Sequence, residues 1–370
     1  MVAARGPGPV IDLDDTEALL AADHDGALRA ASMAGAQVRA TAEAADEGAL
    51  DAVRSDYGDH PPRAVIWVSG RGTAATAGTM LAAALAGSAA EPIVLAADAP
   101  PWIGPLDVLV VAGDDPGDPA LVTAAAVGVR RGARVVVAAP YEGPLRDSTA
   151  GRVAVLAPRM WVPDEFRLPR YLAIGLAALS AVDPGVRPDL AELADELDGE
   201  VLRNSAGREL LTNPAKALAE RLFGCDGVLA GDCAATLALA RHGSAVLLRI
   251  GHTAVAAAGL ADAVTVLRAR QQAGTAGDLF HDDQIDGPAG DRLRVLALTL
   301  AAERTVVTAR IGGLSDVDLI GAEDVPTPPD AAGRPAGLPV PAGADRTEQQ
   351  LAVLAVRLEM TAAYLRLLRG

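Results

Sequence analysis

The sequence contains one pattern twice, and this repeat strongly limits the possible folds. A continuous apolar run, a glycine-containing turn and an alanine-rich helix follow one another at residues 64–84 (AVIWVSGRGTAATAGTMLAAA). The same order returns at residues 227–243 (GVLAGDCAATLALARHG). Apolar runs without alternation indicate strands that are buried on both faces. Strands that alternate with helices are joined by right-handed crossovers and form a parallel sheet.

Further apolar runs extend each copy of the pattern into an α/β unit. We expect the other strands of the first unit at 92–97, 107–113, 134–140 and 152–158, and those of the second at 245–251, 262–269, 292–300 and 316–322. Residues 14–45 and 347–368 are predicted to be helical, the latter with an apolar stripe. The predicted fold class is therefore α/β, with two αβα sandwiches of mainly parallel sheets and additional N-terminal and C-terminal helices.

The same pattern predicts the domain organisation. The stretch PTPPDAAGRPAGLPVPAGAD is rich in proline and glycine, which is typical of a linker. We expect an N-terminal helical segment at 1–50, a first α/β domain at 51–185, a helical connector at 186–225, a second α/β domain at 226–325, the linker at 326–345 and a C-terminal helix at 346–370.

Composition excludes several classes of partner. The net charge of −16 disfavours binding to nucleic acid and to anionic membranes. The two cysteines form no CxxC motif, which fits a reducing cytosol. The N-terminal stretch lacks the apolar region of a signal peptide, and no charge-free apolar run is long enough to span a membrane. We therefore expect a cytoplasmic protein without a cofactor or a metal ion.

The turn at residues 68–78 (VSGRGTAATAG) follows a predicted strand and opens a predicted helix. Backbone N–H groups at such a helix start can bind an anion. A dinucleotide site would require a third glycine, where Ala75 stands, and an acidic residue about 20 positions later, which is missing. Two interpretations stay open, an anion site or a tight turn without a ligand.

His281 lies in the polar stretch LFHDDQIDG, next to Asp282 and Asp283. A histidine beside carboxylates can serve as an acid/base group or as a metal ligand. A solvated loop histidine is an equally good interpretation. No second histidine stands at ligand spacing, which disfavours a metal site.

The order of several motifs resembles the bifunctional phosphoglucose/phosphomannose isomerases, which are built from two sugar isomerase (SIS) domains. The resemblance is to their actinobacterial, TobH-like branch. It rests on the Pro169-Arg170 pair, Asn213-Pro214-Ala215-Lys216, LFHDDQIDG and the C-terminal EMTAAYLRLLRG. It implies a homodimer that interconverts glucose, mannose and fructose 6-phosphates through an enediolate, with the active site between subunits.

The resemblance also implies roles for particular residues. His281 would assist ring opening, and Arg170 would stabilise the enediolate. The first phosphate turn would be Ser69, Gly70, Gly72 and Thr73, and further substrate-binding residues would be Lys216, Arg241 and Asp283. Lys216 is the single lysine of the chain, although helix capping also explains it.

The second phosphate loop of the family departs from its pattern here. Ala112, Asp114 and Gly117 stand where the family has hydroxyl groups, and Asp115 and Asp118 add two more carboxylates. If these acids face a phosphate, each close pair costs about 1 kcal/mol in water. If they cap the following helix, each stabilises it by up to about 1 kcal/mol. The sequence leaves both interpretations open.

The catalytic base of the family is also missing. A count without gaps places Leu248 at that position, and leucine cannot move a proton. A gap in the alignment would let Asp262, Asp278 or Asp283 serve instead. Three hypotheses remain: a working isomerase, a non-catalytic sugar-phosphate-binding or regulatory protein of mannose metabolism, and a protein whose acidic loop binds a cation or an amino sugar.

Overall fold

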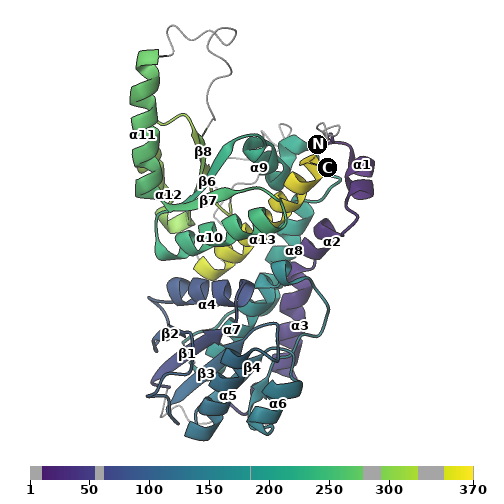
Figure 1. The fold of residues 1–370 in the computed structure, drawn as a ribbon, viewed down its shortest axis with the longest axis vertical. Helices are drawn as coiled ribbons and strands as arrows, with labels where there is room; N and C mark the ends of the chain where they lie inside the picture. Colours follow the sequence, from purple (N-terminus) through teal and green to yellow (C-terminus); the bar gives the residue numbers. More distant parts are fainter. Residues whose placement is uncertain (1–10, 55–61, 184, 278–292, 324–345, 370) are drawn as a thin grey trace, which may run out of the picture. The chain divides into compact units, whose positions relative to one another are not determined.

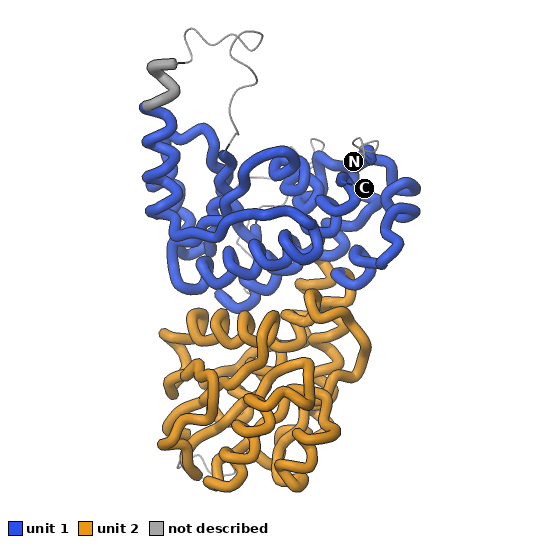
Figure 2. The backbone as a smooth tube through the Cα atoms, in the orientation of Figure 1, with its two compact units in different colours: residues 1–31, 200–370 blue, residues 32–199 orange. Residues whose placement is uncertain are grey.

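The computed structural model describes residues 11–54, 62–183, 185–277, 293–323 and 346–369. The chain divides into two compact units (Figure 2). Unit 1 combines residues 1–31 with residues 200–370, and unit 2 comprises residues 32–199. The N-terminal helices up to residue 31 therefore belong with the C-terminal half of the chain. The domain boundaries drawn from the sequence stay a prediction, and the predicted linker at 326–345 lies outside the described residues.

Unit 2 is built on a five-stranded sheet in the order β2-β1-β3-β4-β5. All of its strand pairs are parallel. Because the chain moves outward from β1 in both directions, the order reverses between β1 and β3, and the loops at their carboxyl ends diverge. The strands are β1 (Ala64–Ser69), β2 (Ile93–Ala96), β3 (Asp107–Ala112), β4 (Arg134–Ala138) and β5 (Ala154–Val155).

Helices cover both faces of this sheet (Figure 1). Successive strand residues point to opposite faces. Ile66 therefore enters the core cluster of Leu121, whereas Trp67 lies against the other face, where a Cβ on Gly78 would come within 2.4 Å of its ring. The helices of unit 2 are α3 (Ala34–Asp46), α4 (Thr73–Ala84), α5 (Pro119–Arg131), α6 (Gly143–Thr149), the 3-10 turn η1 (Asp164–Phe166), α7 (Leu168–Val182) and α8 (Leu190–Arg203), which continues into unit 1.

Unit 1 contains a four-stranded sheet in the order β7-β6-β8-β9, again with parallel pairs throughout. Its strands are β6 (Asp226–Gly231), β7 (Val255–Gly259), β8 (Leu293–Leu298) and β9 (Val317–Ile320). Its helical elements are α1 (Thr16–Ala22), α2 (Ala27–Ala31), η2 (Leu210–Thr212), α9 (Pro214–Leu222), α10 (Ala234–Arg249), α11 (Leu260–Gly277), η4 (Ala301–Glu303), α12 (Arg304–Ile311) and α13 (Thr347–Arg369).

The sheet of unit 1 is also enclosed by helices (Figure 1). Helices α11 and α12 share a core cluster with β6 and β8, and α10 packs against β6, β7 and α13. Gly231 makes the close approach of β6 to α10 possible, because a Cβ there would lie 2.3 Å from the backbone nitrogen of Leu237. The predicted fold class is confirmed, with two αβα sandwiches of parallel sheets and helices at both ends of the chain.

Two predicted strands of the second half are wrong. Residues 245–251 lie mainly in α10, and residues 262–269 lie in α11. Both runs are apolar, and Gly243, which separates the first from the alanine-rich helix before it, does not end α10. A Cβ at Gly243 would lie 2.4 Å from Leu229 of β6, so this glycine lets α10 pack closely on the sheet. The strand that was missed is β7, whose sequence VAAAG is short and rich in alanine, a residue with low β propensity.

Among the described helices, none is both long and apolar enough to cross a membrane.

Candidate functional site

The carboxyl ends of β1 and β3 bring two loops of unit 2 together. Ser69 at the end of β1 pairs with Ala112 at the end of β3. The backbone N–H of Gly70 donates to the carbonyl of Ala112 at 2.8 Å. In open α/β sheets, ligands bind outside the carboxyl ends of the strands where the strand order reverses. The turns 69–73 and 112–118 therefore form the candidate site of unit 2.

In the turn before α4, the side chains do not cap the N–H groups at the start of the helix. Gly72 is the N-cap of α4, with a φ of 80° that favours glycine, and no side chain of the described residues caps the first turn of this helix. Arg71 is exposed, and neither its guanidinium nor the Ser69 hydroxyl has a partner among the described residues. A Cβ on Gly70 would have no atom closer than 3.7 Å. This turn offers N–H groups, a hydroxyl and a cation to a ligand.

Thr73 has a different environment from its neighbours in the turn. Its side chain is buried, and its hydroxyl donates to the backbone carbonyl of Asp164 at 3.1 Å. Thr73 therefore connects the start of α4 to η1. Its predicted contact with a phosphate stays a prediction.

The three carboxylates of the acidic loop all have partners within unit 2. Asp118 is the N-cap of α5 and accepts a hydrogen bond from the N–H of Ala120 at 2.9 Å. Asp115 accepts from the N–H of Gly117 at 2.8 Å, which closes a short turn. An N-cap such as Asp118 stabilises a helix by about 1 kcal/mol. The capping interpretation is the correct one for Asp118, and the start of α5 is closed to an anion by its own carboxylate.

Asp114 is held by two residues from the start of α7. Its Oδ1 accepts hydrogen bonds from Nη1 of Arg167 and from the hydroxyl of Tyr171, both at 2.6 Å. Burial raises the pKa of the Tyr171 hydroxyl, and the charge of Asp114 adds to this. The tyrosine therefore stays protonated and donates. Asp114 is neutralised by Arg167, so it repels an anion in the site less than a free carboxylate would.

The corresponding turn of unit 1 is closed. Asp232, after β6, forms an ion pair with Arg310 of α12. Cys233 is the N-cap of α10 and forms a reciprocal capping box with Thr236. The two copies of the repeated sequence pattern therefore differ in structure: the first turn of α4 has no side-chain cap among the described residues, whereas the first turn of α10 is capped.

Arg170, predicted to stabilise an enediolate, lies at the start of α7 and is 6% exposed. Its Nη2 donates to the carbonyl of Leu156 at 2.7 Å, and its guanidinium lies 4.9 Å from the centre of the Tyr171 ring. Its Nη1 has no hydrogen-bond partner among the described residues. Burial lowers the pKa of Arg170, although a guanidinium stays charged at neutral pH.

Lys216, predicted to bind substrate, is fully buried in unit 1. Its Nζ donates to the carbonyls of Leu13 at 2.5 Å, Ala206 at 2.8 Å and Arg208 at 2.6 Å. An ammonium group has three N–H donors, and all three are used here. Burial lowers the pKa of Lys216. This geometry gives Lys216 a structural role, because no donor is left for a sugar phosphate.

The remaining predicted residues are not brought together in the described part of the chain. Arg241 is exposed on α10. Leu248, 58% exposed, lies near the end of the same helix and lines an open depression of about 440 Å³ at the amino ends of β6 and β7. Asp262 is exposed in the first turn of α11. His281, Asp278 and Asp283 lie outside the described residues.

Sequence reasoning missed three residues of the candidate site. Arg71 stands between the two glycines of the turn, and its position alone was a signal. Arg167 and Tyr171 carried no signal, because they lie 53 and 57 positions along the chain from Asp114. Among the described residues, no group of three or more His, Cys, Asp or Glu side chains is placed to hold a metal ion.

Two buried acids lie away from the site, near the start of β2. Glu91 is 5% exposed, and neither of its carboxylate oxygens has a hydrogen-bond partner within the described residues. Asp183 is also buried and accepts from the N–H groups of Ala90 at 3.0 Å and Gly185 at 2.7 Å. Burial raises the pKa of Glu91, and the charge of Asp183 raises it further.

A pH-dependent gain in stability is expected for Glu91→Gln. A carboxyl group whose folded pKa lies above its unfolded value favours folding only while it is protonated, and this advantage is lost as the pH rises through the folded pKa. At pH 8 the substitution should therefore raise the free energy of unfolding by about 1 kcal/mol or more. The gain should shrink towards pH 4, and urea denaturation at several pH values measures it. Glu196→Gln, at an exposed position of α8, is the control. Equal behaviour of the two variants would contradict the prediction.

Comparison with known proteins identifies solved structures with a similar fold. No protein-family model matches the chain, and no curated protein matches it in sequence. Solved structures do match over nearly the whole length. A tagatose-6-phosphate ketose/aldose isomerase from Escherichia coli has a TM-score of 0.56 at 14% identity, with 98% of this chain and 96% of that chain covered.

Two further structures agree with this match. A glucose-6-phosphate isomerase like protein from Thermus thermophilus has a TM-score of 0.53 at 18% identity, covering 97% of this chain and 94% of that chain. The C-terminal domain of a glucosamine-fructose-6-phosphate aminotransferase from Francisella tularensis has a TM-score of 0.54 at 9% identity, covering 95% and 96%. At these identities the likeness concerns the fold. The two αβα sandwiches are of the SIS type.

Proposed function

We propose that this protein binds a hexose 6-phosphate, with the phosphate at the turn 69–73 of unit 2. The observation that carries the proposal is the contrast between two neighbouring helices. The start of α5 is capped by Asp118, whereas the start of α4 has no side-chain cap and is preceded by Ser69 and Arg71 without partners among the described residues. This open helix start lies where the strand order of the sheet reverses.

The residues of the turn suit a phosphate group. The N-terminus of a helix attracts anions through its N–H groups and its dipole. A guanidinium binds phosphate oxygens through paired N–H donors, and Arg71 is exposed and free to reach them. Asp118 lies on the same side, since its Oδ2 would be 3.7 Å from a Cβ on Gly70. Its charge opposes the phosphate, so we expect modest affinity.

The sugar part of the proposal is supported by the structural neighbours. Their names refer to glucose 6-phosphate, tagatose 6-phosphate and fructose 6-phosphate. Within this class we favour binding with little or no isomerase activity. The count without gaps gives Leu248 for the catalytic base, and Leu248 cannot accept a proton and lies at the amino ends of β6 and β7, whereas ligands of such sheets bind at the carboxyl ends. The predicted homodimer and a regulatory role in mannose metabolism are further parts of the same proposal.

Calorimetric titration of the full chain with glucose, mannose and fructose 6-phosphates tests binding. Arg71→Ala should weaken the binding of at least one sugar phosphate about 10-fold, which corresponds to about 1.4 kcal/mol. The matched control is Arg130→Ala, an exposed arginine in the last turn of α5, at the opposite end of the strands. Equal affinities of the two variants would show that the phosphate does not bind at this turn.

A coupled assay of isomerisation separates binding from catalysis. The wild type should turn over these sugar phosphates weakly or not at all, because a general base commonly contributes about 10² to 10⁴ in rate. Robust turnover that disappears when Asp262, Asp278 or Asp283 is changed to asparagine would instead establish a working isomerase.

A further inference from the structure

A second cavity of unit 2 lies between α3, the segment 156–162 and the start of α7. No residue of the turn 69–73 lines it. It is partly open, and its free volume of about 20 Å³ has room for one small ion or water molecule. Its polar lining includes Gln37, Thr41, Arg159, Arg167 and Arg170.

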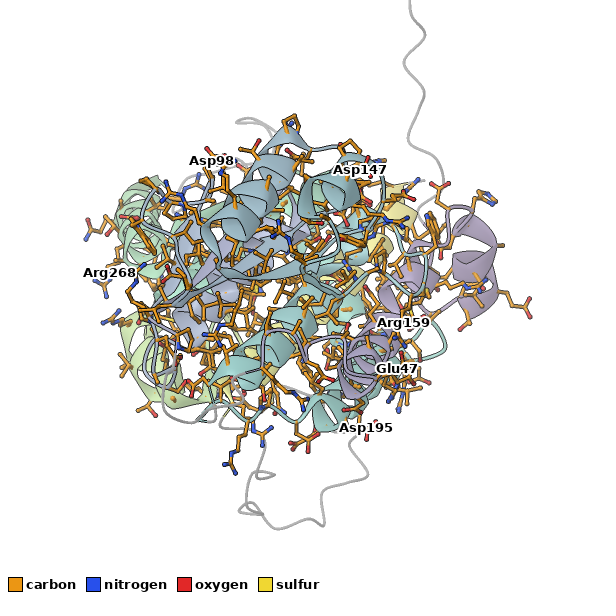
Figure 3. All side chains as sticks on the ribbon, turned by 90° about the horizontal axis from the view of Figure 1, so that it is seen from below. Glu47, Asp98, Asp147, Arg159, Asp195 and Arg268 are labelled. Atoms are coloured by element: carbon orange, nitrogen blue, oxygen red, sulfur yellow. The ribbon has the colours of Figure 1, made fainter. Side chains whose placement is uncertain are left out.

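The charges of this lining are unbalanced. Arg159, at an exposed position, is paired with Glu47, the C-cap residue of α3, and Figure 3 shows the two side chains next to each other. Arg167 contacts Asp114 at 2.6 Å and Asp164 at 3.2 Å. Arg170 forms no ion pair in the described part of the chain, although it is the most deeply buried of the three, and the charge of Asp114 acts on it without direct contact. A buried charge without a direct ion pair is unfavourable, and Asp114 offsets this only in part.

The unused donor of Arg170 belongs to this cavity. Arg170 lines the cavity, and its buried Nη1 has no hydrogen-bond partner among the described residues. Its other terminal nitrogen is held by the carbonyl of Leu156, which fixes the plane of the guanidinium. The nearby carboxylate of Asp114 is already shared by Arg167 and Tyr171. A ligand that satisfies Arg170 must therefore come from outside the described residues.

We propose that this cavity is a binding site for one small monovalent anion of the size of chloride, held by the guanidinium groups of Arg170 and Arg167. The anion neutralises the buried cation and joins α3, the segment 156–162 and α7. A phosphate ester is too large for the free volume, so this site is distinct from the turn 69–73 and does not depend on the proposed function. Bound chloride stabilises the folded state by mass action.

Gln37 makes a water molecule the alternative occupant of this cavity. Its Nε2 donates to the carbonyl of Phe166 at 2.9 Å, and its buried Oε1 has no partner among the described residues. An amide oxygen accepts hydrogen bonds and does not attract an anion. A single water molecule that accepts from Arg170 and donates to Gln37 is therefore the competing occupant.

Bromide distinguishes the two occupants, because it has the charge of chloride and scatters X-rays anomalously. Crystals of the full chain soaked in sodium bromide should show an anomalous peak within hydrogen-bonding distance of Arg170 Nη1. In solution, the urea midpoint of the wild type should rise to a plateau as chloride replaces gluconate at constant ionic strength. Arg170→Met should abolish this dependence, and Arg130→Met should retain it.

The wild-type measurements alone decide the proposal if Arg170→Met does not fold. An ordered water only at Arg170, with no anomalous peak and no saturable effect of chloride, would overturn it. An anomalous peak elsewhere in the molecule, with none in this cavity, would overturn it as well.

Discussion

Arg357→Met should lower the free energy of unfolding of unit 1 by about 3 kcal/mol or more, because removing one partner of a buried ion pair costs about 3–5 kcal/mol. The guanidinium of Arg357 on α13 is buried and donates from Nε to Oε1 of Glu200 at 2.6 Å. It also donates to the carbonyls of Gly321 and Ala322. The substitution leaves all of these acceptors without this donor.

The environment of Glu200 sets the size of this effect. Burial by itself would raise the pKa of Glu200, but Arg357 lowers it, and Arg203 and Asn204 contribute in the same direction. This contribution to stability is present above the ordinary glutamate pKa and is lost as the pH falls through the lowered folded value. Because Arg203 remains bound to Glu200 at 3.0 Å, we expect an effect near the lower end of the range at pH 7.

Urea denaturation of the variant at pH 7 measures the loss. Arg366→Met is the matched control, since Arg366 lies on the same helix and forms an ion pair with Asp25 at the surface. Exposed pairs contribute at most about 1 kcal/mol. The double variant Arg357→Met with Glu200→Met should recover part of the stability. A single variant that costs no more than the control would mean that the buried pair does not stabilise α13.

Lys216→Met should lower the free energy of unfolding of unit 1 by about 2 to 3 kcal/mol, because a buried acceptor left unpaired costs about 1–3 kcal/mol. This cost applies to the bond with Leu13, and the partly buried bonds to Ala206 and Arg208 add less. The carbonyls of Leu13, Ala206 and Arg208 lose their common donor. The segment around Leu13 should then become more susceptible to proteolysis. Lys216→Arg should also destabilise, because a planar guanidinium does not match three converging carbonyls.

The same variant separates the structural role of Lys216 from a role in ligand binding. If Lys216 acts only within unit 1, then Lys216→Met weakens stability and leaves the affinity for sugar phosphates unchanged wherever the protein is folded. Arg221→Met is the control on the same helix, because Arg221 is exposed and pairs with Asp318 at 3.2 Å. A loss of affinity without a loss of stability would restore the substrate-binding interpretation.

The sequence limits the acidic loop to two roles, repelling a phosphate or capping the following helix, but it does not decide between them for each aspartate. Asp118 precedes a proline at the start of a predicted helix, which is a local signal for an N-cap, and the structure confirms it. Asp114 has no such local signal. Its partners Arg167 and Tyr171 reach it only through the packing of α7 near the end of β3, so its environment follows from tertiary contacts.

The helical and strand elements show where local pattern is sufficient. The continuous apolar runs that became β1, β3 and β4 were predicted, because burial on both faces requires apolar residues at every position. The run at 245–251 is equally apolar, yet it continues α10. Periodicity alone does not separate a short buried strand from a buried helical turn. Here the run continues a helix that packs against β6, β7 and α13.

The sequence by itself determined the fold class, the two parallel sheets and the position of the glycine turn at 69–73, because these depend on apolar runs and on residues adjacent in the chain. Only the tertiary structure decided that residues 1–31 join unit 1, that Lys216 is fully bound by backbone carbonyls, and that Arg170 is buried with no ion pair to a described carboxylate. The physical reason is distance along the chain. The partners of these groups are contributed by remote segments, and whether a charged side chain meets carbonyls, a carboxylate or an empty space depends on how those segments pack.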